Sequence, residues 1–423
     1  MRGLAWTAVL AVVMATPFAG TAVAGVDVTM LLMAGAAGAG LMIAVLQGSL
    51  VRLPLVLVAL ALVVSSFVAS TAASGMDAAS VALTVRMALG WGLVLAVWCT
   101  ARADRVLSLL RALAFMATAV AAWTLSGIGP MTSDVGGGVV TGRLQGPFAQ
   151  PNELGMFCAL TLPICLALVL TDRSRRWQLT AASGATLIAA AGVLSLSRGA
   201  WAGTMVALAV MWWLLPTARA RLARAIGATI AVAAVTGAVL GTRLAAVLGE
   251  RVTSLASAAH NPYDHRGELW AAGVRVALEH PWLGVGPGRF GVVASDGGHS
   301  LYRYVADHPH NLVLTVAAET GAYGLATTGL FALLLLATVA AQRRRCAIGG
   351  SGALPAALAG PAAGLAAVAV HGLVDVPLRN PIVESTVWLV LAALVVTTAP
   401  SPLPSSSFPS AARTRPHPTR RSA

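Results

Sequence analysis

Apolar runs recur along nearly the whole chain, and their length, about 20 residues, is the length that a helix needs to cross a bilayer. Hydrophobic residues make up 57% of the sequence and charged residues only 10%, whereas a soluble domain carries roughly 25% charged residues. The mean hydropathy is +0.80. So few charges cannot cover a water-facing surface, and we therefore predict a multi-pass membrane protein.

The runs predict an all-α fold, a polytopic transmembrane helical bundle of about 12 spans with a large helical periplasmic loop. The predicted spans are 4–24, 28–47, 53–71, 79–99, 106–126, 152–171, 178–196, 199–215, 225–241, 311–341, 352–374 and 383–399.

The distribution of arginine predicts how the chain is oriented in the membrane. All 28 basic residues are arginine, the net charge is +13, and the arginines are spread between the apolar runs. One set of connections is arginine-rich, whereas the alternate connections carry aspartates and the long segment 242–310. Positive loops stay inside, which predicts cytoplasmic termini and an outward-facing long segment. No basic stretch is interleaved with aromatic residues on a polar domain, so no nucleic-acid partner is expected. The arginine-rich connections contain Arg2, Arg52, Arg102, Arg105, 172–177, 218–224 and 342–346.

The same pattern divides the chain into five parts. We expect N-terminal spans over 1–126, central spans with outer polar loops over 127–241, and a periplasmic loop over 242–310. C-terminal spans should follow over 311–399, and a disordered cytoplasmic tail rich in proline, serine and arginine over 400–423. An alternative reading makes 1–24 a cleaved signal peptide, because Ala22-Val23-Ala24 resembles a cleavage site.

Polar residues gather where the spans are predicted to meet the outer face, and such groups are costly unless they serve a function. Arg143 precedes the sixth span, where the sequence fits either a Pro/Gly-rich loop with a helix cap at Asn152 or a polar pocket lined by Arg143 and Gln145. Arg198 lies in a very short outer turn, which favours an anion site over contact with lipid phosphate.

The long outer segment supplies more cations. Residues 263–291 predict an amphipathic helix ended by Pro281. Arg266, Arg289 and Arg303 belong to this loop and are candidate ligands for an anion. The expected buried stripe of the helix is Leu269, Trp270, Gly273, Val276 and Ala277.

The sequence His308-Pro309-His310-Asn311 stands before the next apolar run. A helix N-terminus disfavours imidazolium, so we expect the His310 ring to be neutral and able to act as a general base. His308 and His310 are also spaced as zinc ligands, which is the weaker alternative. Several arginines and few carboxylates indicate an anion site for a phosphate-like group. A polyprenyl-diphosphate substrate fits such a site at a membrane surface.

At these residues the chain resembles the O-antigen ligase and polymerase superfamily. The resemblance rests on His310-Asn311 followed, nine residues later, by Gly321-x-x-Gly324, and on the blocks SRGAW, RGELW, HPWLGVGPGRF and HGLVD. It implies a bacterial inner-membrane enzyme of cell-envelope polysaccharide or lipopolysaccharide biosynthesis.

The donor implied by the resemblance is a glycan on undecaprenyl diphosphate, and the acceptor is a hydroxyl of a glycan or lipid-linked molecule. His310 would be the base, with Arg198 and Arg266 binding the diphosphate, and the transfer would invert the anomeric carbon. No metal or cofactor is implied. Membrane lipids would be the other partners. Residues implied or expected to contact substrate are Arg143, Arg289, Arg303, His308 and Asn311.

Other interpretations remain open at this point. A transporter of a small anion or a glycan-related solute would need ionisable residues near the bilayer midplane. A metal-dependent membrane hydrolase would bind its metal through His308 and His310. Gly321 and Gly324 fit close helix packing better than substrate contact. His371 and Asp375 fit a local polar cap better than a group that orients the site. Ligation, repeat-unit polymerisation and protein glycosylation cannot be separated from the sequence.

Overall fold

Helices form almost all of the ordered secondary structure. The computed structural model describes residues 2–23, 26–100, 103–127, 132–135, 138–141, 143–240, 266–296, 308–349 and 354–398. Within these ranges, strands occur only as two short antiparallel hairpins, β1 (Ala22–Val23) with β2 (Val26–Asp27) and β3 (Thr132–Val135) with β4 (Gly138–Thr141). The all-α class predicted from the apolar runs is therefore confirmed, with these hairpins as an addition.

The first part of the chain forms five helices, and polar residues or proline set where several of them begin. Asp27 caps α2 by accepting hydrogen bonds from the backbone N–H groups of Thr29 and Met30, and Pro54 directly precedes α3. The helices are α1 (Arg2–Ala15), α2 (Val28–Leu46), α3 (Leu55–Ala73), α4 (Ala78–Thr100) and α5 (Ala103–Ser126).

The remaining helices complete the bundle and its outer elements. They are α6 (Pro151–Thr171), α7 (Arg175–Leu194), α8 (Arg198–Leu214), α9 (Arg219–Leu240), α11 (Arg266–Glu279), α12 (Phe290–Asp296), α13 (Leu312–Gly349), α14 (Leu354–His371) and α15 (Pro381–Thr398). α14 packs between α6 and α8, α13 packs on α3, and α11 packs on α13.

Multiple helices are long and apolar enough to cross a membrane, which indicates a multi-pass membrane protein. Among the described residues, 8 helices meet this standard on length and hydropathy. In addition, α8 and the start of α9 together form one apolar pair bent by 101°, and Arg2–Phe18 and Leu358–His371 are shorter apolar helices. Each predicted apolar run coincides with a helix, but the number that cross the bilayer stays a prediction.

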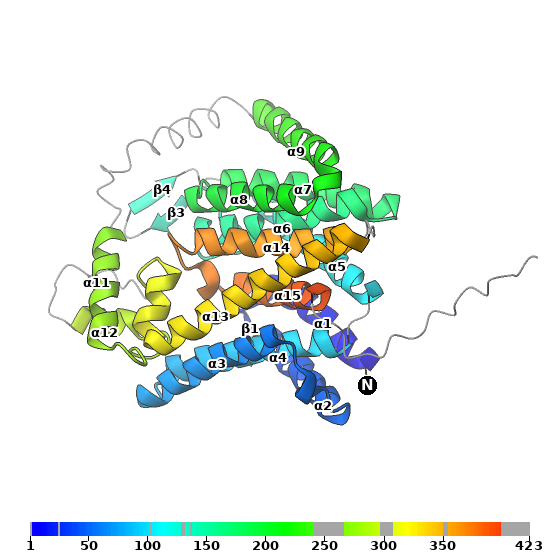
Figure 1. The fold of residues 1–423 in the computed structure, drawn as a ribbon. Helices are drawn as coiled ribbons and strands as arrows, with labels where there is room; N and C mark the ends of the chain where they lie inside the picture. The colour runs from blue at the N-terminus through cyan, green and yellow to red at the C-terminus, as the bar shows by residue number, and fades with distance from the viewer. Residues whose placement is uncertain are drawn as a thin grey trace, which may run out of the picture.

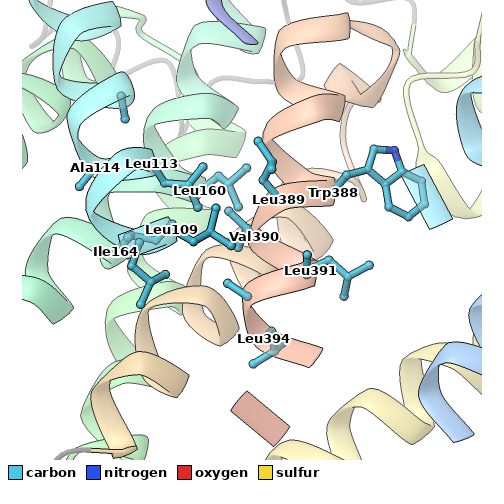
Figure 2. Close-up of a cluster of buried hydrophobic side chains, with 14 of the residues drawn as sticks. Leu109, Leu113, Ala114, Leu160, Ile164, Trp388, Leu389, Val390, Leu391 and Leu394 are labelled. Atoms are coloured by element: carbon cyan, nitrogen blue, oxygen red, sulfur yellow. The ribbon is translucent and has the colours of Figure 1, made fainter. Parts of the chain in front are cut away.

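The core lies where α5, α6 and α15 meet. Leu109 and Leu113 of α5 and Leu160 of α6 approach Leu389 and Val390 of α15 (Figure 2). These five side chains are fully buried, so the centre of the bundle is closely packed. The helix ends around this core are thereby fixed relative to one another.

The elements predicted to face outward gather at one end of the helices. α11, α12 and the β3–β4 hairpin lie at the left of Figure 1, whereas the N-terminus lies at the opposite end. The predicted tail 400–423 and the loop segments 241–265 and 297–307, which include Arg303, lie outside the described residues. In α11 the predicted buried stripe is partly wrong, because Trp270 is 37% exposed while Ala272 is buried.

Candidate active site

His310 lies just outside α13, in a conformation that side chains rarely adopt. Its φ is 51°, in the left-handed region where a non-glycine residue costs backbone strain and often marks a functional position. Asn311 caps α13, because its Oδ1 accepts from Leu314 N at 3.0 Å. Asn311 Nδ2 also donates to Leu373 O at 2.9 Å. These bonds fix His310 beside the loop that follows α14.

Asp375 in that loop holds the imidazole. The distance from His310 Nδ1 to Asp375 Oδ1 is 2.7 Å, and the carboxylate is only 4% exposed. When the carboxylate accepts from Nδ1–H, Nε2 is left as the basic nitrogen of the neutral ring. The carboxylate also stabilises the positive charge that develops when Nε2 takes a proton. This is the arrangement of an oriented general base.

Asn152 and Arg143 extend this arrangement into α6 and the preceding loop. Asn152 Nδ2 donates to Asp375 Oδ2 at 2.6 Å, and Arg143 Nη2 donates to Asn152 Oδ1 at 2.8 Å. Arg143 Nε donates to Ser195 O at 3.0 Å. The hydrogen bonds therefore join four side chains in one row, from three loops and the first turn of α6: Arg143, Asn152, Asp375 and His310.

The helix-cap alternative for Asn152 is wrong, because the N-cap residue of α6 is Gln150. Glu153 satisfies the free N–H groups there, because its carboxylate accepts from Ala149 N at 2.9 Å and from Gln150 N at 3.1 Å. Asn152 is thus released to bind Asp375. The proline that precedes Asn152 begins α6 without needing a cap from that side chain.

The Asp375 carboxyl is kept ionised by its neighbours. Burial pushes its pKa up, but the hydrogen bond with His310 and the nearby histidines outweigh burial and hold the pKa well below its usual range. Val376 N contributes a further hydrogen bond to Oδ1 at 2.8 Å. The acceptor for His310 is therefore a fixed negative charge.

His371 connects the two arginines predicted to bind diphosphate. It is 1% exposed, and its Nδ1 has no hydrogen-bond partner among the described residues. A Cβ on Gly199 would lie 2.5 Å from His371 Cδ2, so the residue that follows Arg198 touches this ring. The positive charge of Arg266 also acts on His371. The backbone beside Arg198 and the charge of Arg266 therefore both lie near His371.

Arg198 is also the first residue of α8. Ser197 caps this helix, with its Oγ accepting from Ala200 N at 3.4 Å. A helix N-terminus carries partial positive charge and N–H groups that favour anions. The end of α8 adds this charge to the two arginines.

His308 packs against His310 and could complete a metal site. The two ring centroids are 4.4 Å apart, and His308 Nδ1 accepts from His310 N at 3.1 Å. One potential ligand atom from each of His308, His310 and Asp375 lies within 4.8 Å of the others. Imidazole and carboxylate groups at this separation suit a transition metal such as zinc. The prediction that the reaction needs no metal therefore remains to be tested.

Arg289 makes a different contact. Its Nη1 donates to Ser74 O at 3.0 Å, in the connection between α3 and α4. Its segment docks onto α13, with Val285 N donating to Ala318 O at 2.9 Å. This contact supports a structural role for Arg289, and its predicted substrate contact stays a prediction. The predicted role of Arg303 falls outside the described residues.

Sequence reasoning missed the joint role of Asn152 and Asp375. Each was weighed as a local cap, because a cap is the commonest use of such a residue beside a helix. The two residues are 223 positions apart, so no local spacing reveals their hydrogen bond. Their shared position at predicted outer helix ends was the available signal.

Together, the apolar helices and this row of polar side chains at their ends define a multi-pass membrane protein with a basic, histidine-containing site. The O-antigen ligase family model matches residues 183–329. This match confirms the resemblance to the O-antigen ligase and polymerase superfamily over these residues. It includes Arg198, Arg266 and His310, whereas Arg143 and Asp375 lie outside it. No curated protein matches the chain. The family match supports a function like that of O-antigen ligases or polymerases, whose substrates are in general lipid-linked glycans.

Proposed function

We propose that the protein transfers a glycan from undecaprenyl diphosphate to an acceptor hydroxyl at the periplasmic face of the bacterial inner membrane. The observation that carries this proposal is the 2.7 Å contact between His310 Nδ1 and the buried Asp375. It gives the site an oriented base, and the nearby arginines give it an anion-binding side.

In this proposal His310 Nε2 takes the proton of the acceptor hydroxyl. The hydroxyl oxygen attacks the anomeric carbon while the bond from that carbon to the diphosphate oxygen breaks. Attack from the opposite face inverts the anomeric configuration. The proton stays on the imidazole, and the negative charge leaves with the polyprenyl diphosphate. A positioned base of this kind contributes about 10²–10⁴-fold to a rate.

Arg198 and Arg266 bind the leaving diphosphate in the same step. Guanidinium groups match the geometry of phosphate oxygens, and the N-terminus of α8 supports the same charge. Such fixed donors stabilise the charge that grows in the transition state, the role that a metal ion plays in other enzymes.

Arg143 acts in this proposal mainly through Asn152. Its contacts with Asn152 Oδ1 and Ser195 O orient the amide that holds Asp375. Arg143 is therefore a positioning residue, and contact with the donor is its secondary role. His308 and Asn311 border the base and remain candidate substrate contacts.

The direct test is transfer by the purified protein in lipid, using a labelled glycan on polyprenyl diphosphate and a panel of acceptors. We expect labelled product, and its size separates a single ligation from chain growth. Arg198→Gln and Arg266→Gln should each lower kcat by about 10²–10³, the effect of losing one fixed donor.

The matched control is Arg343→Gln. Arg343 stacks on Trp213 with 4.4 Å between its guanidinium carbon and the ring centroid, in a part of the chain predicted to be cytoplasmic, and its loss should leave transfer unchanged. Equal losses in all three variants, or no transfer with any acceptor, would overturn the proposal.

One observation favours a second function, transport of a small anion. Arg86 lies eight residues into α4, about 12 Å along the helix axis, and forms an ion pair with Glu384 of α15. A cavity lined by this pair and by Asp27 has a volume of about 20 Å³. That space fits a water or a small ion rather than a glycan.

Vesicles containing the protein distinguish this alternative. Uptake of a small anion that is lost in Arg86→Gln, in a protein that transfers no glycan, would favour transport. Glycan transfer that persists in the same variant would assign the Arg86–Glu384 pair to structure.

A further inference from the structure

Helix α11 has two apolar faces, and the described residues of the chain bury only one of them. The inner face contains Leu269, Ala272 and Val276, each 7% exposed or less. On the same side, a Cβ at Gly273 would lie 3.2 Å from Pro309 Cβ. The inner face of α11 therefore packs directly beside His310.

The outer face is a stripe of large apolar side chains. Trp270 is 37% exposed, Val274 46% and Leu278 75%, and Trp282, just beyond the helix, is 75% exposed. The helical residues are four apart, so they lie along one side of α11. We call Trp270, Val274, Leu278 and Trp282 the outer stripe.

Three of the four charged residues of α11 lie on a separate side of the helix. At 100° per residue, Glu268, Arg275 and Glu279 fall on one narrow sector between the outer stripe and the inner face. The fourth, Arg266, is the first residue of α11 and lies one turn before Trp270, at the end of the same row, so Trp270, Val274 and Leu278 have no charged residue between them. A helix with this division has one face for the protein, one apolar face for another surface, and a polar edge for water.

The outer stripe continues onto a surface that lipid must cover. Tyr323 N of α13 donates to Trp282 O at 3.2 Å, so the end of the stripe touches α13. Only 17% of the most apolar stretch of α13 is buried within the protein, and its mean hydropathy is 2.0. Leu333 and Leu336 on this helix are 67% and 66% exposed. Such a helix is stable only with acyl chains around it.

The direction of α11 also suits the plane of the membrane surface. It runs across the direction of α8 and α14, at the end of the bundle predicted to face outward (Figure 1). Tryptophan is enriched where membrane meets water, because the indole has an apolar body and a polar N–H group. Helices with an apolar face and a charged edge lie in this interface.

We propose that α11 is an interfacial helix whose outer stripe inserts into the outer leaflet of the membrane. The occupant of the stripe is phospholipid at the boundary between headgroups and acyl chains. Through Gly273 and Pro309, the inserted helix would hold His310 at the level where a lipid-borne diphosphate lies. This inference concerns the membrane contact of α11 and does not depend on the chemistry proposed for the site.

The test places a fluorescent label on the stripe of the full chain in lipid nanodiscs. Cys99, Cys158 and Cys165 are buried, so a Cys346→Ser background with Leu278→Cys directs the label to the stripe. We expect acyl-chain nitroxide lipids to quench this label at least twofold more than iodide does. The neighbouring substitution Glu279→Cys is the matched control, and its label should show the reverse preference.

Two outcomes would overturn the inference. Equal iodide quenching at positions 278 and 279 would place the stripe in water. Protection of position 278 from both quenchers would mean that a protein surface, such as a second copy of this chain, covers it. As a check without labels, Leu278→Asp should shift Trp282 towards water, seen as reduced total tryptophan quenching by brominated lipid relative to Glu279→Gln.

Discussion

At the scale of single residues, the site depends on one carboxylate that serves two partners. Asp375 binds His310 through Oδ1 and Asn152 through Oδ2. Because its pKa is held below the usual range, the carboxylate favours the folded state at any pH above the ordinary aspartate value of about 4. That contribution is lost only as the pH falls further, through the pKa of the folded state.

Replacing Asp375 by asparagine should impair catalysis more than folding. The amide keeps the shape but cannot fix the tautomer or balance the imidazolium, so we expect kcat to fall by about 10²–10⁴-fold. Steady-state transfer assays on the variant measure this loss. Asn152→Ala removes a side chain that lies one hydrogen bond further from His310. We expect it to lower kcat by a smaller factor than Asp375→Asn does, and to change kcat more than KM. Wild-type kcat in Asp375→Asn, with an unchanged pH profile, would remove His310 from the role of base.

Metal ions give a second prediction at this scale. A zinc ion bound by His308, His310 and Asp375 would compete with the hydrogen bond between His310 and Asp375 that orients the base. We therefore expect added Zn²⁺ to inhibit transfer and a chelator to leave the untreated enzyme active. Titration of activity with Zn²⁺ and with EDTA checks both. Loss of activity on chelation, restored by zinc, would support the metal-dependent hydrolase or another metal mechanism instead.

At the scale of elements, α13 contains a break that its sequence pattern hides. The apolar run continues through Gly321, yet this glycine has φ 64° and ψ −160° and divides the helix in two. The break receives backbone hydrogen bonds on both sides, including Ala322 N to Pro281 O at 2.7 Å. The expectation of close packing at Gly321 agrees with this contact, although the partner is a loop rather than a helix.

Gly321→Ala should therefore destabilise the protein. A Cβ would clash with the Trp282 backbone, and a positive φ costs about 1–3 kcal/mol for a residue with a side chain. Thermal unfolding in detergent should show a lower Tm. Gly329→Ala is the control, because nothing lies within 4 Å of its added Cβ and alanine favours helix. A Tm for Gly321→Ala at or above that of the control would contradict this account.

Particular residues show which parts of the fold could be predicted from the sequence. Run length and hydropathy predicted the helices, because each helix must satisfy its backbone internally in a bilayer. They did not predict the exposure of Trp270, since an apolar face on a soluble protein would be buried. They also did not predict the row from Arg143 to His310, because its members come from segments far apart in the chain. Distant pairing is set by helix packing, which no local pattern records.

At the scale of the whole molecule, the distribution of arginine predicts the orientation in the membrane. The helix ends that carry α11, α12 and the β3–β4 hairpin lie opposite the N-terminus (Figure 1), in agreement with the predicted alternation. α1 packs in the same core, with Val9, Val12 and Val13 fully buried. The first helix is therefore a packed part of this bundle.

Reporter fusions should confirm this orientation. We expect alkaline phosphatase, which is active only outside the cytoplasm, to be active when fused after residue 296 and inactive when fused after residue 345, because positive loops remain inside. A fluorescent protein that matures only inside should show the opposite pattern. The reverse result at both positions would place His310 in the cytoplasm and exclude a periplasmic reaction.

The proposed binding of the diphosphate by Arg198 and Arg266 has a consequence for turnover. A diphosphate that carries a sugar has one ionisable oxygen fewer than the diphosphate left behind after transfer. Arg198 and Arg266 should therefore hold the spent carrier lipid more tightly than the incoming donor. Departure of that lipid, rather than bond breaking, is then expected to limit the steady-state rate. An enzyme of this design works fastest where spent carrier is removed promptly from the surrounding membrane.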